Sequence, residues 1–146
     1  MHNTARHVGV VVKDLEKSIN FWTEVIGLRI HIDALEPSPY IDRLIGIASP
    51  KLRTVKLIDD NKFIIELLEY SSFEVSSEWS GSLASVGLTH IALTVDNLDR
   101  LTTKLKIDEY EFISEIQYPP SGLVKVVFVK GPENLMLELV EELKQK

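Results

Sequence analysis

The sequence of 146 residues contains no cysteine. Disulfide bonds, thiol catalysis and thiolate metal sites are therefore excluded, so any metal ion must be bound by His, Asp, Glu or carbonyl oxygens. No apolar run approaches the roughly 20 residues that cross a bilayer as a helix. The first residues also lack an apolar signal core behind a basic end. These absences predict a soluble, cytoplasmic protein.

Positive charge is also scarce. The chain has 16 Lys and Arg against 22 Asp and Glu, a formal net charge of −6, and no basic run. Nucleic acids and anionic membranes both need a basic surface, so neither is expected as a partner, and a small-molecule substrate is expected instead. Apolar residues make up 45% of the chain, which is enough for a substantial core. The length favours one domain over residues 1–146.

The sequence contains an internal repeat. The segment from His7 to Leu15 resembles the segment from His90 to Leu98, with an offset of 83, and 63–69 resembles 135–141, with an offset of 72. Two matches in the same order indicate a duplication. The offsets differ by 11, so the first copy contains an insertion of about that size. We place it around 36–50, where Glu-Pro-Ser-Pro-Tyr breaks regular structure.

Residues 5–70 are predicted to form one β-α-β-β-β module. The β-branched residues at 6–12 favour a strand, and Asp14 can cap a helix over about 15–26. That helix carries one apolar stripe and ends at Gly27; the stripe residues are Leu15, Ile19, Trp22 and Ile26. The remaining elements of this module are strands at 28–34, 52–59 and 62–70, with a short helix near 40–46.

The same order recurs over residues 87–142, after a linker at about 71–86 that is rich in Ser and Glu. The expected elements are a strand at 88–95, a helix at about 97–106, and strands near 111–117, 123–130 and 135–141. The predicted fold class is therefore α+β, with two βαβββ modules.

A histidine occupies the same place at the start of each copy. Strand side chains alternate between faces, so His7 shares a face with Gly9, and His90 shares a face with Ala92. Small neighbours leave room beside each imidazole. A single strand histidine is usually structural, but the matching repeat positions favour a common role for these two.

A glutamate likewise lies in the middle of the last strand of each copy. Glu66 and Glu138 have apolar neighbours on their own faces, and a carboxylate there is costly unless it is paired or bound to a metal. If the modules form one curved mixed sheet, His7, Glu66, His90 and Glu138 can point into one cleft. Two imidazoles with two carboxylates suit one Zn²⁺, Ni²⁺, Co²⁺, Mn²⁺ or Fe²⁺ ion and leave positions open for substrate.

Other polar and aromatic residues receive structural interpretations. Glu69 and Glu141 fall on the opposite strand faces near strand ends, so we expect them to be solvated. His31 is expected at the surface, and Trp22 in the core.

Over nearly its whole length the chain resembles the vicinal oxygen chelate superfamily, also called the glyoxalase/bleomycin resistance/dioxygenase fold. The resemblance rests on four segments: His7-x₆-Asp14-Leu15-x₂-Ser18-x₂-Phe21-Trp22-x₄-Gly27-Leu28, Ile65-Glu66-Leu67, Gly87-Leu-Thr-His90-Ile-Ala-Leu-Thr-Val-Asp96 and Pro132-x₅-Glu138-Leu139. The second and fourth segments are similar to those of glyoxalase I and methylmalonyl-CoA epimerase.

The resemblance implies paired βαβββ modules, homodimers and one divalent metal ion that holds two neighbouring oxygens of a substrate. It also implies that the metal acts as a Lewis acid on a carbonyl, while Glu138 or Glu66 removes and returns a proton. In similar enzymes the glutamate matching Glu138 is the usual choice. The leading hypothesis is thus a metal-dependent lyase or isomerase, of the lactoylglutathione lyase or methylmalonyl-CoA epimerase type.

Two other functions stay open at this point. An extradiol-type dioxygenase would hold Fe²⁺ with two His and one carboxylate, which leaves Glu66 as a surplus ligand. A non-catalytic, resistance-type binding protein would commonly lack the metal ligands. Relatives that recognise glutathione often carry an Arg and an Asn where this chain has Val11 and Tyr70, and no basic motif marks a coenzyme A site. The sequence also leaves open which substrate and which metal are bound. It does not decide whether the site forms within one chain or between the two chains of a dimer.

Overall fold

The structure is a computed structural model that describes residues 4–76, 83–84 and 86–143. The chain divides into two compact units, Met1–Ser76 and Ser77–Lys146, each with a sheet and a helix of its own. The boundary lies within the segment 71–86 that the sequence predicts as a linker. No helix among the described residues is long and apolar enough to cross a membrane.

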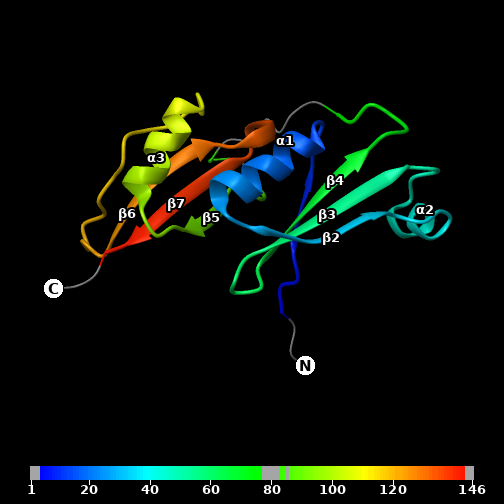
Figure 1. The fold of residues 1–146 in the computed structure, drawn as a ribbon, viewed down its shortest axis with the longest axis horizontal. Coiled ribbons are helices and arrows are strands. Elements are labelled where there is room, and N and C mark those ends of the chain that lie inside the picture. The colour runs from blue at the N-terminus through cyan, green and yellow to red at the C-terminus, as the bar shows by residue number, and fades with distance from the viewer. Residues whose placement is uncertain (1–3, 77–82, 85, 144–146) are drawn as a thin grey trace. The chain divides into compact units, whose positions relative to one another are not determined.

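The first unit is a complete βαβββ module with one extra helix (Figure 1). Its elements are β1 (Val8–Val11), α1 (Leu15–Asn20), the π-helix η1 (Phe21–Ile26), β2 (Arg29–Leu35), α2 (Tyr40–Ile45), β3 (Leu52–Ile58) and β4 (Ile64–Tyr70). The four strands form one sheet in the order β1-β4-β3-β2. Strand β1 is parallel to β4, and the other neighbours are antiparallel.

The second unit repeats this arrangement. Its elements are β5 (Ile91–Thr94), α3 (Leu98–Ile107), β6 (Val124–Lys130), the 3-10 helix η2 (Pro132–Asn134) and β7 (Met136–Glu142). The sheet order β5-β7-β6, with β5 parallel to β7, corresponds to β1-β4-β3 of the first unit. The predicted α+β class with paired modules is confirmed, and the strands hydrogen-bond as one sheet per module.

The predicted strand at 111–117 is wrong. This segment makes only two isolated bridges to β6 within the described residues, Phe112 to Val129 and Gln117 to Val126. Five residue steps on the segment therefore oppose three on β6, and the excess bends out of the ladder. Inside the bend, the Ser114 hydroxyl and the Gln117 amide donate to the Glu115 carbonyl, which replaces ladder bonds with local ones.

The helix predicted at 15–26 is present but changes type within its length. Asp14 caps it, because the Asp14 carboxylate accepts the Lys17 N–H at 2.9 Å. The first six residues are α-helical, and Phe21–Ile26 forms a π-helix. Gly27 ends the helix with a φ of 93°, a left-handed conformation that glycine adopts without strain. Trp22 is buried as expected, and His31 is exposed.

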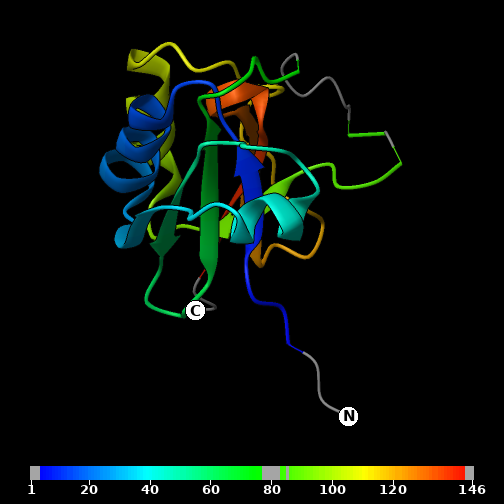
Figure 2. The ribbon, with the colours of Figure 1, turned by 90° about the vertical axis from the view of Figure 1, so that its right-hand side faces the viewer.

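The hydrophobic core of the first unit lies between the sheet and α1. Figures 1 and 2 show α1 on one side of these strands. Ile65 and Leu67 of β4 are fully buried, and Glu66 between them is only partly buried. Because strand side chains alternate, Glu66 must point to the sheet face opposite the core. The burial of Leu137 and Leu139 in β7 gives Glu138 the same orientation.

Glu69 and Glu141 are not solvated as the sequence predicts. The Leu98 N–H donates to Glu141 Oε2 at 2.5 Å, and the Leu15 N–H donates to Glu69 Oε1 at 3.4 Å. Strands β1 and β5 lead into the helices and run parallel to β4 and β7, so each strand end lies beside a helix start. Each glutamate therefore accepts an otherwise unpaired N–H at the positive end of a helix.

A basic residue pairs with carboxylates at the start of each helix. The buried Lys125 pairs with Asp99 at 2.5 Å and with Glu141 at 3.1 Å. The hydrogen bonds that Lys125 donates to these carboxylates, Asp99 first, raise the pKa of Lys125. Arg53 holds the matching place in the first unit, where it pairs with Glu16 at 2.8 Å.

The contact of Glu141 with α3 should contribute measurably to stability. Glu141→Ala removes the acceptor of the Leu98 N–H and one of the carboxylates that pair with Lys125. We expect the free energy of unfolding, measured by urea titration, to fall by about 1.5–3 kcal/mol. Glu142→Ala, at the exposed neighbouring position, is the matched control and should change it by less than about 0.5 kcal/mol. Equal effects of the two variants would contradict the proposed role of Glu141.

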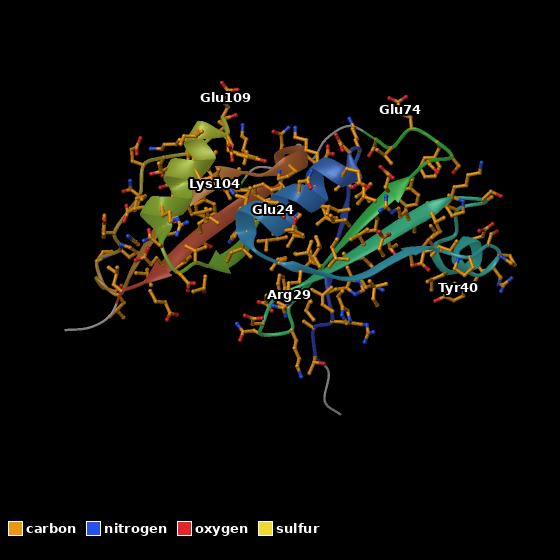
Figure 3. The ribbon with its side chains drawn as sticks, viewed as in Figure 1. Glu24, Arg29, Tyr40, Glu74, Lys104 and Glu109 are labelled. Atoms are coloured by element: carbon orange, nitrogen blue, oxygen red, sulfur yellow. The ribbon has the colours of Figure 1, made fainter. Side chains whose placement is uncertain are left out.

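Glu69→Ala should have a smaller effect than Glu141→Ala, because its bond to the Leu15 N–H is longer, at 3.4 Å. Its matched control is Glu74→Ala. Figure 3 shows Glu74 on the segment after β4, with its side chain pointing away from the strands.

Candidate metal centre

The first candidate pair lies on the face of the first sheet opposite α1. His7 directly precedes β1, and Glu66 lies in β4, which runs parallel to β1. The Nε2 atom of His7 lies 3.0 Å from Oε2 of Glu66. The His7 side chain is 31% exposed and the Glu66 side chain 13% exposed. A largely buried carboxylate is thus satisfied by a partly exposed imidazole.

The second candidate pair repeats this geometry in the second unit. His90 directly precedes β5, and its Nε2 atom lies 3.1 Å from Oε2 of Glu138 in β7. The Nδ1 atom of His90 lies 2.8 Å from the Thr89 hydroxyl. Because Nδ1 has its own partner, Nε2 is the nitrogen that faces the carboxylate. Metal-binding histidines use their two ring nitrogens in the same way, one for the metal and the other for a hydrogen bond.

Small residues lie opposite both glutamates in the parallel ladders. Gly9 is in register with Glu66, and Ala92 is in register with Glu138. A Cβ atom at Gly9 would lie 4.0 Å from Glu66 Oε2 and 3.3 Å from Leu68. The small side chains predicted beside each histidine therefore leave space next to each carboxylate.

Lys56 is a residue of this face that the sequence interpretation leaves without a role. It lies in β3 directly opposite Glu66, and its Nζ atom is 3.2 Å from Glu66 Oε1. The matching residue of the second unit is Phe128, opposite Glu138, whose ring packs edge-on against His90. The repeat offset of 72 aligns Lys56 with Phe128, so comparing the copies position by position would have revealed the difference.

The donor atoms of each pair fit a divalent metal ion. Imidazole nitrogen and carboxylate oxygen are ligands of Zn²⁺, Mn²⁺, Fe²⁺ and related ions. The structure brings His7 to Glu66 and His90 to Glu138, one pair within each unit. Across residues 4–76, 83–84 and 86–143, no group of three or more His, Asp or Glu side chains is gathered as a metal site. Each pair by itself offers two donor side chains.

Comparison with known proteins places this chain in one family. The profile of the "Glyoxalase/Bleomycin resistance protein/Dioxygenase superfamily" matches residues 4–139. The chain belongs to this superfamily, as its paired modules and the four sequence segments indicate.

The individual relatives are distant in sequence and cover almost the whole chain. A lactoylglutathione lyase of Escherichia coli O157:H7 is 24% identical over 139 residues, 93% of this chain and 90% of that protein. The structure of a glyoxalase family protein from Bacillus cereus has a TM-score of 0.86 at 22% identity, with 96% of this chain and 94% of that chain covered. The fosfomycin resistance protein FosX of Listeria monocytogenes, in complex with Mn(II) and sulfate ion, has a TM-score of 0.65 at 14% identity, with 98% and 95% covered.

Proposed function

We propose that His7, Glu66, His90 and Glu138 together bind one divalent metal ion in a lyase or isomerase of glyoxalase or epimerase type. Each module provides one histidine and one glutamate, and the two modules come from one chain or from two chains of a homodimer. The proposed substrate is a small molecule or thioester with a carbonyl next to an acidic C–H bond.

The observation that carries the proposal is the repeated His–Glu pair. Two pairs with Nε2–Oε2 distances of 3.0 and 3.1 Å occupy equivalent places in two copies of the module. Both pairs lie on the sheet faces opposite Leu67 of β4 and Leu137 and Leu139 of β7, which are fully buried. The relative named lactoylglutathione lyase and the Mn(II) complex of FosX support an enzyme and a divalent metal.

A bound divalent ion would act as a Lewis acid that makes a C–H bond beside a substrate carbonyl acidic. Glu138 then removes that proton and returns it to the same or the neighbouring atom. Glu66 is the weaker candidate for the base, because Lys56 already pairs with its Oε1 atom. His7 and His90 would bind the metal ion and thereby orient the substrate. The partly buried strands around both pairs limit access of water.

The proposal does not extend to a glutathione adduct as the substrate. The positions where glutathione-dependent relatives often carry Arg and Asn hold Val11 and Tyr70. Val11 is 47% exposed, so an apolar side chain that cannot donate a hydrogen bond occupies the accessible end of β1. The proposed reaction is therefore a proton transfer of the glyoxalase or epimerase kind with another small substrate.

Metal analysis of the purified protein tests this proposal. Chelator-treated protein should rebind about one equivalent of Co²⁺ or Zn²⁺ per complete set of four ligands, measured by elemental analysis and by Co²⁺ absorption. At a free metal concentration of 100 times Kd, binding should stabilise the fold by about 2.7 kcal/mol. Absence of any bound divalent ion after reconstitution would overturn the proposal.

A further inference from the structure

Lys56 breaks the symmetry of the two His–Glu pairs. Its ammonium group lies 3.2 Å from one oxygen of Glu66, while His7 lies 3.0 Å from the other oxygen. Phe128, the matching residue of the second unit, places an uncharged ring beside His90 and opposite Glu138. The first pair therefore has a cationic neighbour, and the second has an aromatic one.

The lysine remains accessible despite its ion pair. Its side chain is 24% exposed and lies on the same face of the sheet as Glu66. Arg53, the other basic residue of β3, lies on the opposite face and is occupied by Asp33 and Glu16. The Arg53 guanidinium also lowers the pKa of Asp33 by its hydrogen bonds. This arginine therefore has a structural role in the first unit. Within the part of the chain that the structure describes, Glu66 is the one carboxylate in an ion pair with Lys56.

The charges of the proposed ligand set indicate a function for Lys56. A divalent ion with two carboxylates and two neutral imidazoles carries no net charge. Glu66 would then share its negative charge with the metal, and Lys56 would leave one uncompensated positive charge next to the bound substrate. In a protein of net charge −6, a local positive charge of this kind favours an anionic ligand.

We propose that Lys56 binds an anionic group of the substrate, so that the site takes small molecules carrying a carboxylate or another oxyanion beside their metal-binding oxygens. This inference rests on the proposed metal site and narrows the class of substrate. An ammonium group has three donors, so Lys56 can keep its bond to Glu66 Oε1 and still donate to a substrate oxyanion. Phe128 leaves the second module without a matching charge, so the anionic group must lie on the side of the first module.

Two hydroxamates that differ in one charge test the inference by binding alone. Succinic acid monohydroxamate carries a metal-chelating group and a carboxylate, and its amide analogue carries the same chelating group with the carboxylate replaced by a neutral amide. Titrated into the Co²⁺-loaded protein, the carboxylate probe should bind about tenfold more tightly than the amide probe. Calorimetry and the Co²⁺ absorption bands both report this difference.

Three variants locate the preference at Lys56. Lys56→Met should remove the preference for the carboxylate probe while the amide probe binds as before, and Lys56→Arg should keep most of it. Phe128→Leu, at the matching position of the second module, is the control and should leave the preference unchanged.

The outcomes separate the inference from the proposed function. Equal binding of the two probes to the unmodified protein overturns the role of Lys56 and leaves the metal site standing. Equal weakening of both probes, or loss of Co²⁺, in Lys56→Met also overturns it, because Lys56 would then act by holding Glu66. Failure of both probes to bind the Co²⁺-loaded protein also overturns the role of Lys56 and leaves the metal site standing, whereas failure of the protein to take up Co²⁺ removes the proposed metal site itself.

Discussion

Glu138→Gln should lower the rate of proton exchange in a bound substrate by about 10²- to 10⁴-fold, the range that a general base contributes. Glutamine keeps the size of the side chain and an oxygen ligand but cannot take up a proton. The measurement is incorporation of solvent deuterium beside the carbonyl of pyruvate, 2-oxobutyrate or an acyl-CoA, with the metal-loaded protein. The loss should appear in the rate, with the metal content retained.

Two comparisons make this result specific for Glu138. Glu66→Gln should weaken metal binding more than it slows exchange at saturating metal, because Lys56 already holds one oxygen of Glu66. Glu142→Gln, on the exposed end of β7, should behave like the unmodified protein. Exchange that survives in Glu138→Gln at full metal occupancy would remove Glu138 as the base.

His7→Ala and His90→Ala should each weaken binding of Co²⁺ or Zn²⁺ by at least about 100-fold. Loss of a partner that only supports a ligand costs 10- to 100-fold, and a ligand contributes more than its support. Both variants should lose the metal, although the histidines belong to different modules, because one ion is proposed to need both pairs. Competition with a chelating dye measures the affinities.

The exposed His31 provides the matched control for these variants. His31→Ala should bind metal as the unmodified protein does, since His31 lies on β2 away from both pairs in sequence and is exposed. If His7→Ala kept half of the original metal content at full affinity, the two pairs would bind separate ions, and the shared site would be wrong.

Periodicity and repetition in the sequence predicted most of the module. The helix cap at Asp14, the helix end at Gly27 and the strand faces of Glu66 and Glu138 follow from local rules that depend on near neighbours in the chain. The strand predicted at 111–117 failed because the bend between Phe112 and Gln117 depends on the register against β6. The alternation of apolar residues within one segment carries no information on whether the partner strand has the same number of residues between two paired positions.

The roles of Glu69, Glu141 and Lys56 needed the tertiary structure. Glu69 and Glu141 contact residues that are distant in sequence, and Lys56 contacts a residue of the next strand, so strand periodicity fixes only the face on which each lies. Glu141 accepts the Leu98 N–H because β5 runs parallel to β7 and ends where α3 begins. Lys56 meets Glu66 because the turn after β3 sets the antiparallel register with β4. In that turn the Phe63 N–H donates to the Asp59 carboxylate at 2.7 Å.

The sequence by itself determined the duplication, the four candidate residues His7, Glu66, His90 and Glu138, and the face on which each residue lies, because strand alternation and repeat offsets are properties of the chain alone. The tertiary structure decided the distances within each pair and the neighbours that distinguish them, a lysine beside Glu66 and a phenylalanine opposite Glu138. These depend on strand register, which turns and packing set between residues far apart in the chain.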